Sequence, residues 1–237
     1  MLNKINVKTQ NKRYRARKRL RIEQFLSPII ANELKAGLSL EPIPMHLAHF
    51  LDGEPKTMPS ENFTQLSVET KAELQREWYK LAAVGVGYVY ETLMPSRLSE
   101  ADQIRDHPTV KLLTKVCDAL VSGEAIDRVR EITGNRSIKS ADAQVTRFGS
   151  GHYLTRHRDD APGKNRQCAY VLSLSHDWHP DWGGLLNFYD QDGSINEVWI
   201  PKFNTLALFD IQHIHSVSYV TPYARTRRWS ITGWYMG

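Results

Sequence analysis

The chain has 237 residues, of which 41% are hydrophobic and 10% aromatic, and its formal net charge is +5. This composition excludes a disordered or fibrous chain, and no apolar run approaches the roughly 20 residues of a membrane-spanning helix. Because the N-terminus has no secretory signal and the two cysteines, Cys117 and Cys168, give no disulfide framework, we expect a soluble protein of the reducing cytoplasm.

Positive charge is concentrated at the N-terminus. Residues 1–21 contain nine Lys or Arg and no Asp or Glu, which leaves 22 basic and 26 acidic residues, a net charge of −4, in residues 22–237. We therefore predict a basic tail over 1–21 and a single domain over 22–237. Such a tail could bind nucleic acid or acidic lipid. A solvated arm, or the basic face of a first strand, is the favoured alternative because Tyr14 is its only aromatic residue.

The first part of the domain, 22–140, is predicted to be mostly helical. Ser27 and Pro28 are typical of a helix start and predict a helix over 28–37. Residues 40–63 are rich in proline and should be irregular or form short strands. Three further helices are predicted, over 68–94, from Pro108 to Gly123, and over 124–132.

From residue 141 onward, the pattern changes to the alternation of β-strands. Eight strands are predicted, over 143–149, 153–158, 168–175, 184–190, 195–200, 205–210, 214–220 and 227–236. This number of short strands indicates a jelly-roll core, and the preceding helices should pack outside it. The predicted fold is mainly β with N-terminal helices (α+β), with the core over 141–237.

A His-x-Asp pair, His157 and Asp159, lies in the run RFGSGHYLTRHRDD. Side chains two apart in a strand share a face, so both could hold one metal ion. A third ligand must come from another strand, and His215 is the candidate, with His213 as its rival. Two His and one carboxylate on one face of an ion are typical of non-haem Fe(II) oxygenases, whereas a structural zinc site usually has four ligands.

The last predicted strand places Arg228 and Ser230 on one face. A buried arginine is costly unless it meets an anion, and arginine suits a carboxylate, to which Ser230 could add a hydroxyl donor. The alternative is an arginine paired with an aspartate of the protein. Arg225 is a rival for the anion-binding role but should face outward.

Six ordered motifs, YLTRHRDD, CAYVLSLSHDW, WGGLLNFYD, IPKFNTLALFD, HSV and RRWSITGWY, resemble the Fe(II)- and 2-oxoglutarate-dependent dioxygenases, in particular their prolyl 4-hydroxylase-like branch. The resemblance covers about 141–237 and implies a double-stranded β-helix. It also implies that His157, Asp159 and His215 bind iron and that Arg228, with Ser230 beside it, holds the distal carboxylate of 2-oxoglutarate. His215 is preferred to His213 because it is followed by a small residue and valine, as in the family.

The same resemblance implies a hydroxylase that uses Fe(II), 2-oxoglutarate and O2, with ascorbate as a candidate reductant. Its expected substrate is a protein or peptide side chain, with proline as the leading candidate. Two alternatives stay open: a hydroxylase of a small molecule such as an amino acid or natural product, and a non-catalytic barrel whose basic tail binds nucleic acid. No membrane partner is expected, and the oligomeric state is not predicted.

The chain departs from the family where relatives often place tyrosines that contact the co-substrate. It has Ser173 at one such position and Arg147 or Phe148 at the other. Tyr153 shares the parity of His157 and is a candidate substitute, with a core tyrosine as the equal alternative.

Four other residues are given structural interpretations. His176 and His179 are interpreted as loop residues and not as a second metal site. Trp199 and Trp234 are interpreted as core residues.

Overall fold

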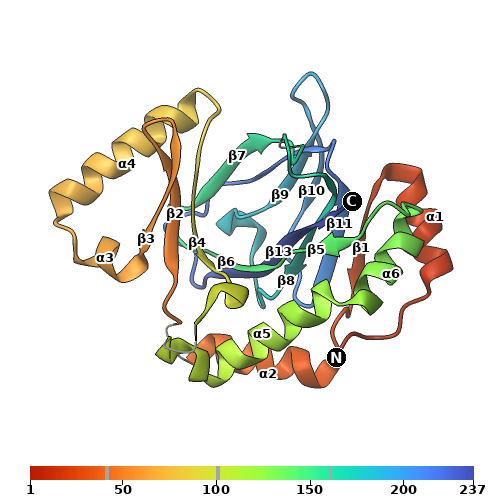
Figure 1. Cartoon of the computed structure of the whole chain (residues 1–237). Helices are drawn as coiled ribbons and strands as arrows, with labels where there is room; N and C mark the ends of the chain where they lie inside the picture. Colours follow the sequence, from red (N-terminus) through yellow and green to blue (C-terminus); the bar gives the residue numbers. More distant parts are fainter. Residues whose placement is uncertain (41–42, 100–101, 161) are drawn as a thin grey trace.

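The computed structural model of the chain describes residues 1–40, 43–99, 102–160 and 162–237. Within these residues, antiparallel strands form one strongly curved sheet, and helices lie outside it (Figure 1). The helices are α1 (Val7–Arg17), α2 (Pro28–Leu40), α3 (Ser60–Gln65), α4 (Val68–Ala83), α5 (Pro108–Val121) and α6 (Gly123–Thr133), with short 3-10 turns η1 (Pro95–Arg97), η2 (Gln103–Asp106) and η3 (Pro180–Trp182). The predicted fold, a jelly-roll core with helices outside it, is confirmed.

The strands follow the order β1-β11-β8-β13-β6-β4-β7-β12-β9-β10 across the sheet, and β2, β3 and β5 pair outside this path. Their bounds are β1 (Arg19–Glu23), β2 (His46–Leu51), β3 (Glu54–Pro59), β4 (Tyr88–Leu93), β5 (Ser140–Ala141), β6 (Gln144–Phe148), β7 (Tyr153–His157), β8 (Arg166–Ser173), β9 (Leu186–Tyr189), β10 (Ile195–Trp199), β11 (Thr205–Asp210), β12 (Ile214–Val217) and β13 (Arg228–Met236). Each of the eight strands predicted after residue 141 is present, within a few residues of its expected bounds.

The predicted helix over 68–94 is correct only in its first part. Helix α4 ends at Ala83, and Gly85 and Gly87 have φ values of +81° and +122°, which a helix interior does not allow. The chain then forms β4, which pairs with β2, β6 and β7 and enters the middle of the sheet. The side chains of a central strand therefore come from a segment predicted to be helical.

The N-terminal segment is part of the folded domain and is not a solvated arm. Helix α1 contains most of its basic residues, and β1 pairs with β11 from Arg19 opposite Phe209 to Glu23 opposite Thr205. The expected boundary between residues 21 and 22 therefore falls inside a strand. Of the two favoured alternatives, the basic face of a first strand is correct for the end of the segment.

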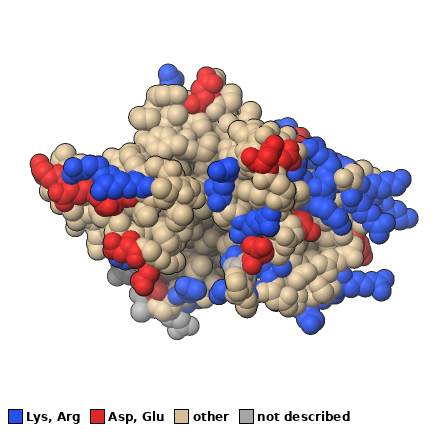
Figure 2. Space-filling view, turned by 90° about the horizontal axis from the view of Figure 1, so that it is seen from above, with Lys and Arg blue, Asp and Glu red and all other residues tan. Residues whose placement is uncertain are grey.

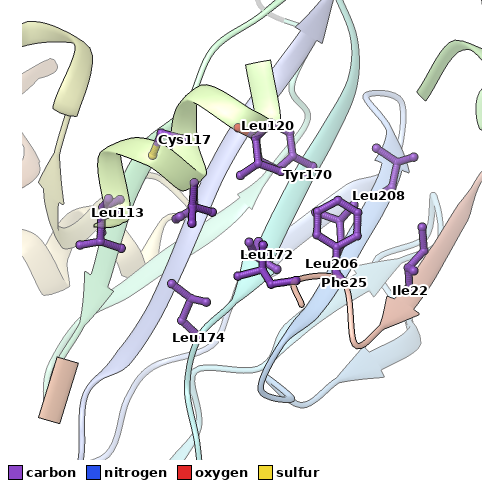
Figure 3. Close-up of a cluster of buried hydrophobic side chains, with 14 of the residues drawn as sticks. Ile22, Phe25, Leu113, Cys117, Leu120, Tyr170, Leu172, Leu174, Leu206 and Leu208 are labelled. Atoms are coloured by element: carbon purple, nitrogen blue, oxygen red, sulfur yellow. The ribbon is translucent and has the colours of Figure 1, made fainter. Parts of the chain in front are cut away.

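Helix α5 packs its apolar face against the outer face of the sheet, as predicted (Figure 3). The layer includes Leu113, Cys117, Leu120, Tyr170, Leu172, Leu206 and Leu208, each at most 5% exposed. Because consecutive strand residues point to opposite faces, this packing leaves Ala169 and Val171 of β8 on the inner face, where they line a cavity. None of the helices in the described part of the chain combines the length and hydrophobicity needed to span a bilayer.

Candidate metal and co-substrate site

The predicted metal ligands come together at the paired ends of β7 and β12. His157 and His215 are register partners, and their ring centroids lie 4.2 Å apart. Asp159, two residues beyond the end of β7, is 4% exposed. Its Oδ1 lies 3.6 Å from Nε2 of His157, and its Oδ2 lies 3.5 Å from Nε2 of His215. One atom from each residue lies within 4.8 Å of the other two, so the three can share an ion.

Backbone carbonyls fix the orientation of both imidazoles. Nδ1 of His157 is 2.9 Å from the carbonyl oxygen of Thr155, and Nδ1 of His215 is 3.0 Å from that of His213. Since a carbonyl only accepts hydrogen bonds, each Nδ1 is assigned as the donor. Each Nε2 therefore carries a lone pair on the side of the ring that faces Asp159. Burial, together with the neighbouring His157, lowers the pKa of His215 to about 4, so its ring is neutral and able to bind metal at neutral pH.

This donor set fits a catalytic transition metal better than a closed structural site. It offers two imidazole nitrogens and one carboxylate, and the described residues contain no other group of three such side chains. A structural zinc ion would usually take a fourth protein ligand. His176 lies 2.9 Å from Asp177 and His179 lies 3.5 Å from Asp181, so each has a local loop partner, as their structural interpretation expects.

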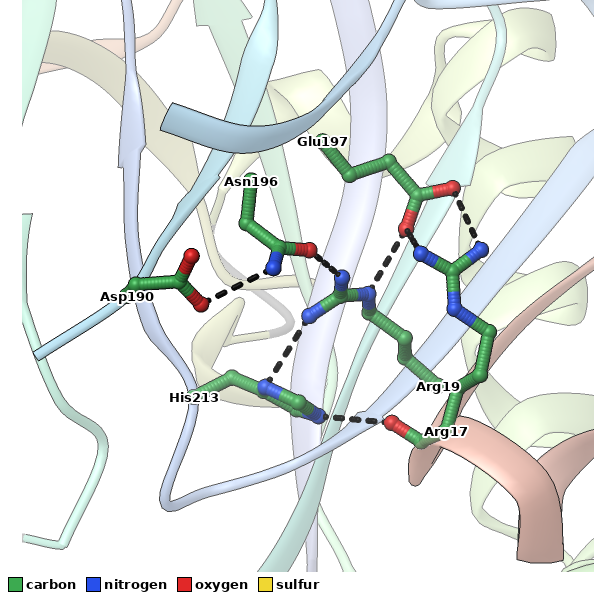
Figure 4. Close-up of polar contacts among 6 residues, drawn as sticks. All are labelled: Arg17, Arg19, Asp190, Asn196, Glu197 and His213. Atoms are coloured by element: carbon green, nitrogen blue, oxygen red, sulfur yellow. Dashed lines mark hydrogen bonds and ion pairs between the residues drawn. The ribbon is translucent and has the colours of Figure 1, made fainter. Parts of the chain in front are cut away.

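His213, the rival ligand, is held away from the metal site by the N-terminal segment (Figure 4). Its Nδ1 lies 3.2 Å from Nη1 of Arg19, and its Nε2 lies 3.2 Å from the carbonyl oxygen of Arg17. Arg19 in turn donates to Glu197 at 2.7 Å, which joins β1 to β10 at the opposite end of the strand order. His213 therefore contributes to barrel closure, and its carbonyl orients His215.

Arg228 is a buried cation that has no carboxylate partner among the described residues. It is 2% exposed, its guanidinium lies 5.1 Å from the ring centroid of Phe148, and Nη1 donates to Oγ of Ser230 at 3.2 Å. Its Nε has no hydrogen-bond partner, and no ion pair involves Arg228 among the described residues. Burial lowers the pKa of Arg228 to about 10, which still leaves it charged at neutral pH. Within the described ranges, no aspartate pairs with Arg228, so the alternative interpretation is not observed there.

One cavity of about 500 Å³ joins the metal ligands to Arg228. Its wall includes Thr146 and Phe148 of β6, Tyr88 and Tyr90 of β4, and Arg166 and Trp234. Ser230 is fully buried behind this wall and shares a 3.1 Å hydrogen bond with Thr146, which fixes the hydroxyl that receives Arg228. The cavity is thus basic at one end and has ligands for a metal along its wall.

Tyr153 does not take part in this cavity, and its prediction as a co-substrate contact is wrong. Its hydroxyl donates to the carbonyl oxygen of Trp78 at 2.8 Å, and its ring lies in a cluster with Leu47 and Trp78. The cause is a register shift between β7 and β12, where Leu154 pairs with Val217 although His157 pairs with His215. A bulge adds one residue to a strand, so the residues before it point to the face opposite to the one that simple alternation predicts. Leu154 therefore lines the cavity in place of Tyr153.

Several cavity residues were not predicted, among them Tyr90, Arg166 and Trp234. Tyr90 stacks on Phe148 with ring centroids 5.3 Å apart, and its pKa is raised to about 12 by burial. Arg166 lies 3.8 Å from Oδ1 of Asp159 and 3.5 Å from the ring centroid of Trp234. Trp234, interpreted as core, is only partly buried and lines the cavity, whereas Trp199 is a core residue as expected. The alternation in YVYETL was a usable signal for Tyr90, but the preceding helical spacing obscured it.

The residues at the positions where the resembled family often has tyrosines differ in their contacts. Arg147 makes two hydrogen bonds of 2.5 and 2.7 Å to Glu91 and so has an internal partner. Phe148 lines the cavity. Ser173 is buried, and its hydroxyl has no hydrogen-bond partner among the described residues. Arg225 is exposed, as expected for the rejected rival of Arg228.

Comparison with known proteins connects this geometry to a family. Residues 143–236 match the sequence model of the 2OG-Fe(II) oxygenase superfamily. Over 103 residues, the chain is 35% identical to prolyl 3-hydroxylase OGFOD1 of Mus musculus, a match that covers 40% of this chain and 18% of that protein. The chain therefore spans only about a fifth of the curated relative.

Two solved structures share the fold across most of the chain. A prolyl-4-hydroxylase of Pseudomonas putida has a TM-score of 0.60 and 14% identity over 98% of both chains. A prolyl hydroxylase of Trichoplax adhaerens, in complex with a hypoxia inducible factor peptide fragment, has a TM-score of 0.60 and 18% identity over 97% of this chain and 88% of that one. At these identities, the likeness establishes the fold, including its helical part.

Proposed function

Because residues 143–236 belong to the 2OG-Fe(II) oxygenase superfamily, we propose that this chain is an Fe(II)- and 2-oxoglutarate-dependent dioxygenase that hydroxylates a protein or peptide side chain, with proline as the leading target. One observation supports this most directly. A buried guanidinium, which has no carboxylate partner in the described part of the chain, shares a cavity with two imidazoles and a carboxylate that lie within reach of one ion. A 2-oxo diacid that binds metal at one end presents a carboxylate at the other, which matches this pairing.

In this proposal, His157 and His215 bind Fe(II) through Nε2 and Asp159 binds it through a carboxylate oxygen. The carbonyls of Thr155 and His213 hold both rings in the required tautomer. With three protein ligands, the ion keeps positions for 2-oxoglutarate and O2. The bound ion and co-substrate supply the oxidising chemistry, in which 2-oxoglutarate yields succinate and carbon dioxide while one oxygen atom enters the substrate.

Arg228 and Ser230 position the co-substrate. The guanidinium offers charge-assisted hydrogen bonds to the distal carboxylate, and the low polarity around Phe148 strengthens them. Ser230 orients Arg228 from behind through the 3.2 Å contact to Nη1. Arg228 therefore distinguishes a diacid from a shorter 2-oxo acid.

The preference for proline is supported by the wall of the cavity and by the relatives. A row of aromatic rings lines this wall, formed by Phe50, Tyr88, Tyr90 and Phe148. The ring centroids are 6.2 Å apart for Phe50–Tyr88, 5.4 Å for Tyr88–Tyr90 and 5.3 Å for Tyr90–Phe148. Aromatic faces suit the apolar ring of proline, which carries no donor of its own. The mouse relative is a prolyl 3-hydroxylase, and the Trichoplax structure holds a peptide.

The test is succinate formation from 2-oxoglutarate with Fe(II), O2 and ascorbate, in the presence of a library of proline-containing peptides. We expect a peptide to increase turnover and to gain the mass of one oxygen atom at proline. His157→Ala should remove both signals while retaining the fold. No succinate above the metal-free background would contradict the proposed activity. Oxidation of free amino acids without oxidation of peptides would instead assign a small-molecule substrate.

A further inference from the structure

A second feature of the chain lies outside the cavity, where α1 and α6 border a basic groove. Two adjoining hollows of about 680 and 470 Å³ share Gly134 and Arg136. The exposed cations that line them form what we call the basic groove: Lys8, Lys12, Arg15, Lys18 and Arg136. Seen from above, Lys and Arg gather on the side of the molecule where α1 lies, whereas the α4 side carries both charges (Figure 2).

These cations have no carboxylate partners in the described part of the chain. None of the five takes part in an ion pair, and the nearest aromatic contact is Lys18 at 6.0 Å from the ring centroid of Tyr14. Arg17 and Arg19, by contrast, pair with Glu197 and close the barrel. Two of the N-terminal cations, Arg17 and Arg19, therefore serve the fold through Glu197, whereas the cations of the basic groove form no ion pair among the described residues.

The positions of the basic-groove cations on α1 do not stabilise the helix overall. Lys8, Lys12 and Arg15 follow each other at i, i+4 and i+7 on one face, and each like-charged pair at such spacing disfavours a helix by roughly 0.2–0.5 kcal/mol. Arg15 suits the C-terminal end of the helix dipole, but Lys8 lies in the first turn, where a cation is unfavourable. An anion bound along this face would relieve the repulsion among these cations.

We propose that the basic groove binds the phosphate backbone of double-stranded nucleic acid. A single strand would be held partly by stacking on exposed aromatic rings, but Tyr14, the only aromatic residue of α1, is 2% exposed. A membrane-surface helix needs an exposed apolar face, and α1 has no exposed large hydrophobic residue. Contact to phosphates alone predicts binding that is independent of base sequence and similar for RNA and DNA.

The salt dependence of binding gives the proposal a magnitude. Five neutralised phosphates predict a slope of log K against log salt of about −4 to −5, which weakens binding about 500-fold between 50 and 200 mM salt. Each contact removed should reduce the slope by about 1. The proposed binding of nucleic acid can be tested independently of the proposed oxygenase activity, because no charged residue lines both the groove and the cavity.

The test measures binding of the full chain to labelled RNA and DNA duplexes of about 20 base pairs by fluorescence anisotropy across a salt series. Lys12→Gln/Arg15→Gln should weaken binding at least about tenfold at 50 mM salt and reduce the slope by about 2. The matched control, Arg76→Gln/Lys80→Gln, removes the same charge from exposed positions on α4 and should bind like wild type. Both variants should unfold near the wild-type temperature.

Three results would overturn the proposal: no salt-dependent duplex binding by the wild type, an equal loss in the α4 control, or tighter binding to single strands than to duplexes. Vesicles containing phosphatidylserine provide a further arm. Binding to these vesicles that exceeds duplex binding and is lost in the α1 variant would assign the groove to lipid and also refute the proposal.

Discussion

Replacing Arg228 with methionine should stabilise the ligand-free protein while removing its response to the co-substrate. Burial lowers the pKa of this guanidinium from 12.5 to about 10, and that difference corresponds to about 3 kcal/mol against the charged form. Methionine occupies the space of the aliphatic part of the arginine side chain and has no charge, so it should recover part of this cost. In a domain of this size, recovery of the full amount, about 3 kcal/mol, would raise the melting temperature by about 6–12 °C, which is the upper value.

Arg147 provides the matched control because it is a second buried arginine, on the neighbouring strand, that does have a partner. Arg147→Met would leave Glu91, whose side chain is 8% exposed, without hydrogen bonds of 2.5 and 2.7 Å. Breaking a buried pair costs about 3–5 kcal/mol, and Arg227 at 3.6 Å from Glu91 would offset only part of it. The same substitution should therefore shift the melting temperature in opposite directions at the two sites.

The assay is thermal unfolding followed by circular dichroism, without ligand and with Mn(II) plus N-oxalylglycine, an inert mimic of 2-oxoglutarate. At 100 times its dissociation constant, the mimic should stabilise the wild type by about 2.7 kcal/mol. Arg228→Met should lose most of this gain, whereas Arg228→Lys should keep part of it. The reasoning fails if Arg228→Met is destabilised as strongly as Arg147→Met, or if it responds to the mimic like wild type.

Three further outcomes are expected. Asp159→Ala should abolish 2-oxoglutarate turnover and the thermal shift with Mn(II) but keep the wild-type circular dichroism spectrum; a retained shift would contradict the assigned ligand. Tyr90→Phe should raise the KM for 2-oxoglutarate by about 5–30-fold if its hydroxyl contacts the co-substrate, whereas Tyr153→Phe should leave KM unchanged and cost about 1 kcal/mol of stability. Burial raises the pKa of Glu91, but the hydrogen bonds and charge of Arg147 more than offset this, so its pKa is below 4.5. The wild type should therefore lose stability as pH falls below 4.5, and Glu91→Gln should show less of this loss in acid titrations followed by fluorescence.

The C-terminal half could be predicted from sequence because local and tertiary preferences agree there. Its strands show alternating apolar and polar residues and are separated by turn residues, and most of them pair with other strands of the same half. The candidate metal ligands could also be identified from local sequence features. His157 and Asp159 lie close together in the chain, and His215 has a local signature that separates it from His213.

Two errors had non-local causes. The bulge in β7 reversed the parity that placed Tyr153 beside His157, and a bulge depends on the pairing of two strands. The basic N-terminal segment looked like a tail because its composition is polar, yet β1 pairs with β11 almost 200 residues away. Amino-acid composition gives no information about a pairing between strands so far apart in the sequence.

The misread segment around β4 had the largest consequence for the site. The expected helix over 68–94 included residues 88–94, so the sequence indicated no carboxylate partner for Arg147. Strand β4 places Glu91 opposite Arg147 in the register, so a carboxylate of the protein itself neutralises this buried arginine. Arg228 receives no such carboxylate from the described residues. A buried arginine in a sequence therefore predicts only that an anion is needed, and whether that anion is internal or a ligand depends on which carboxylates the fold brings to it.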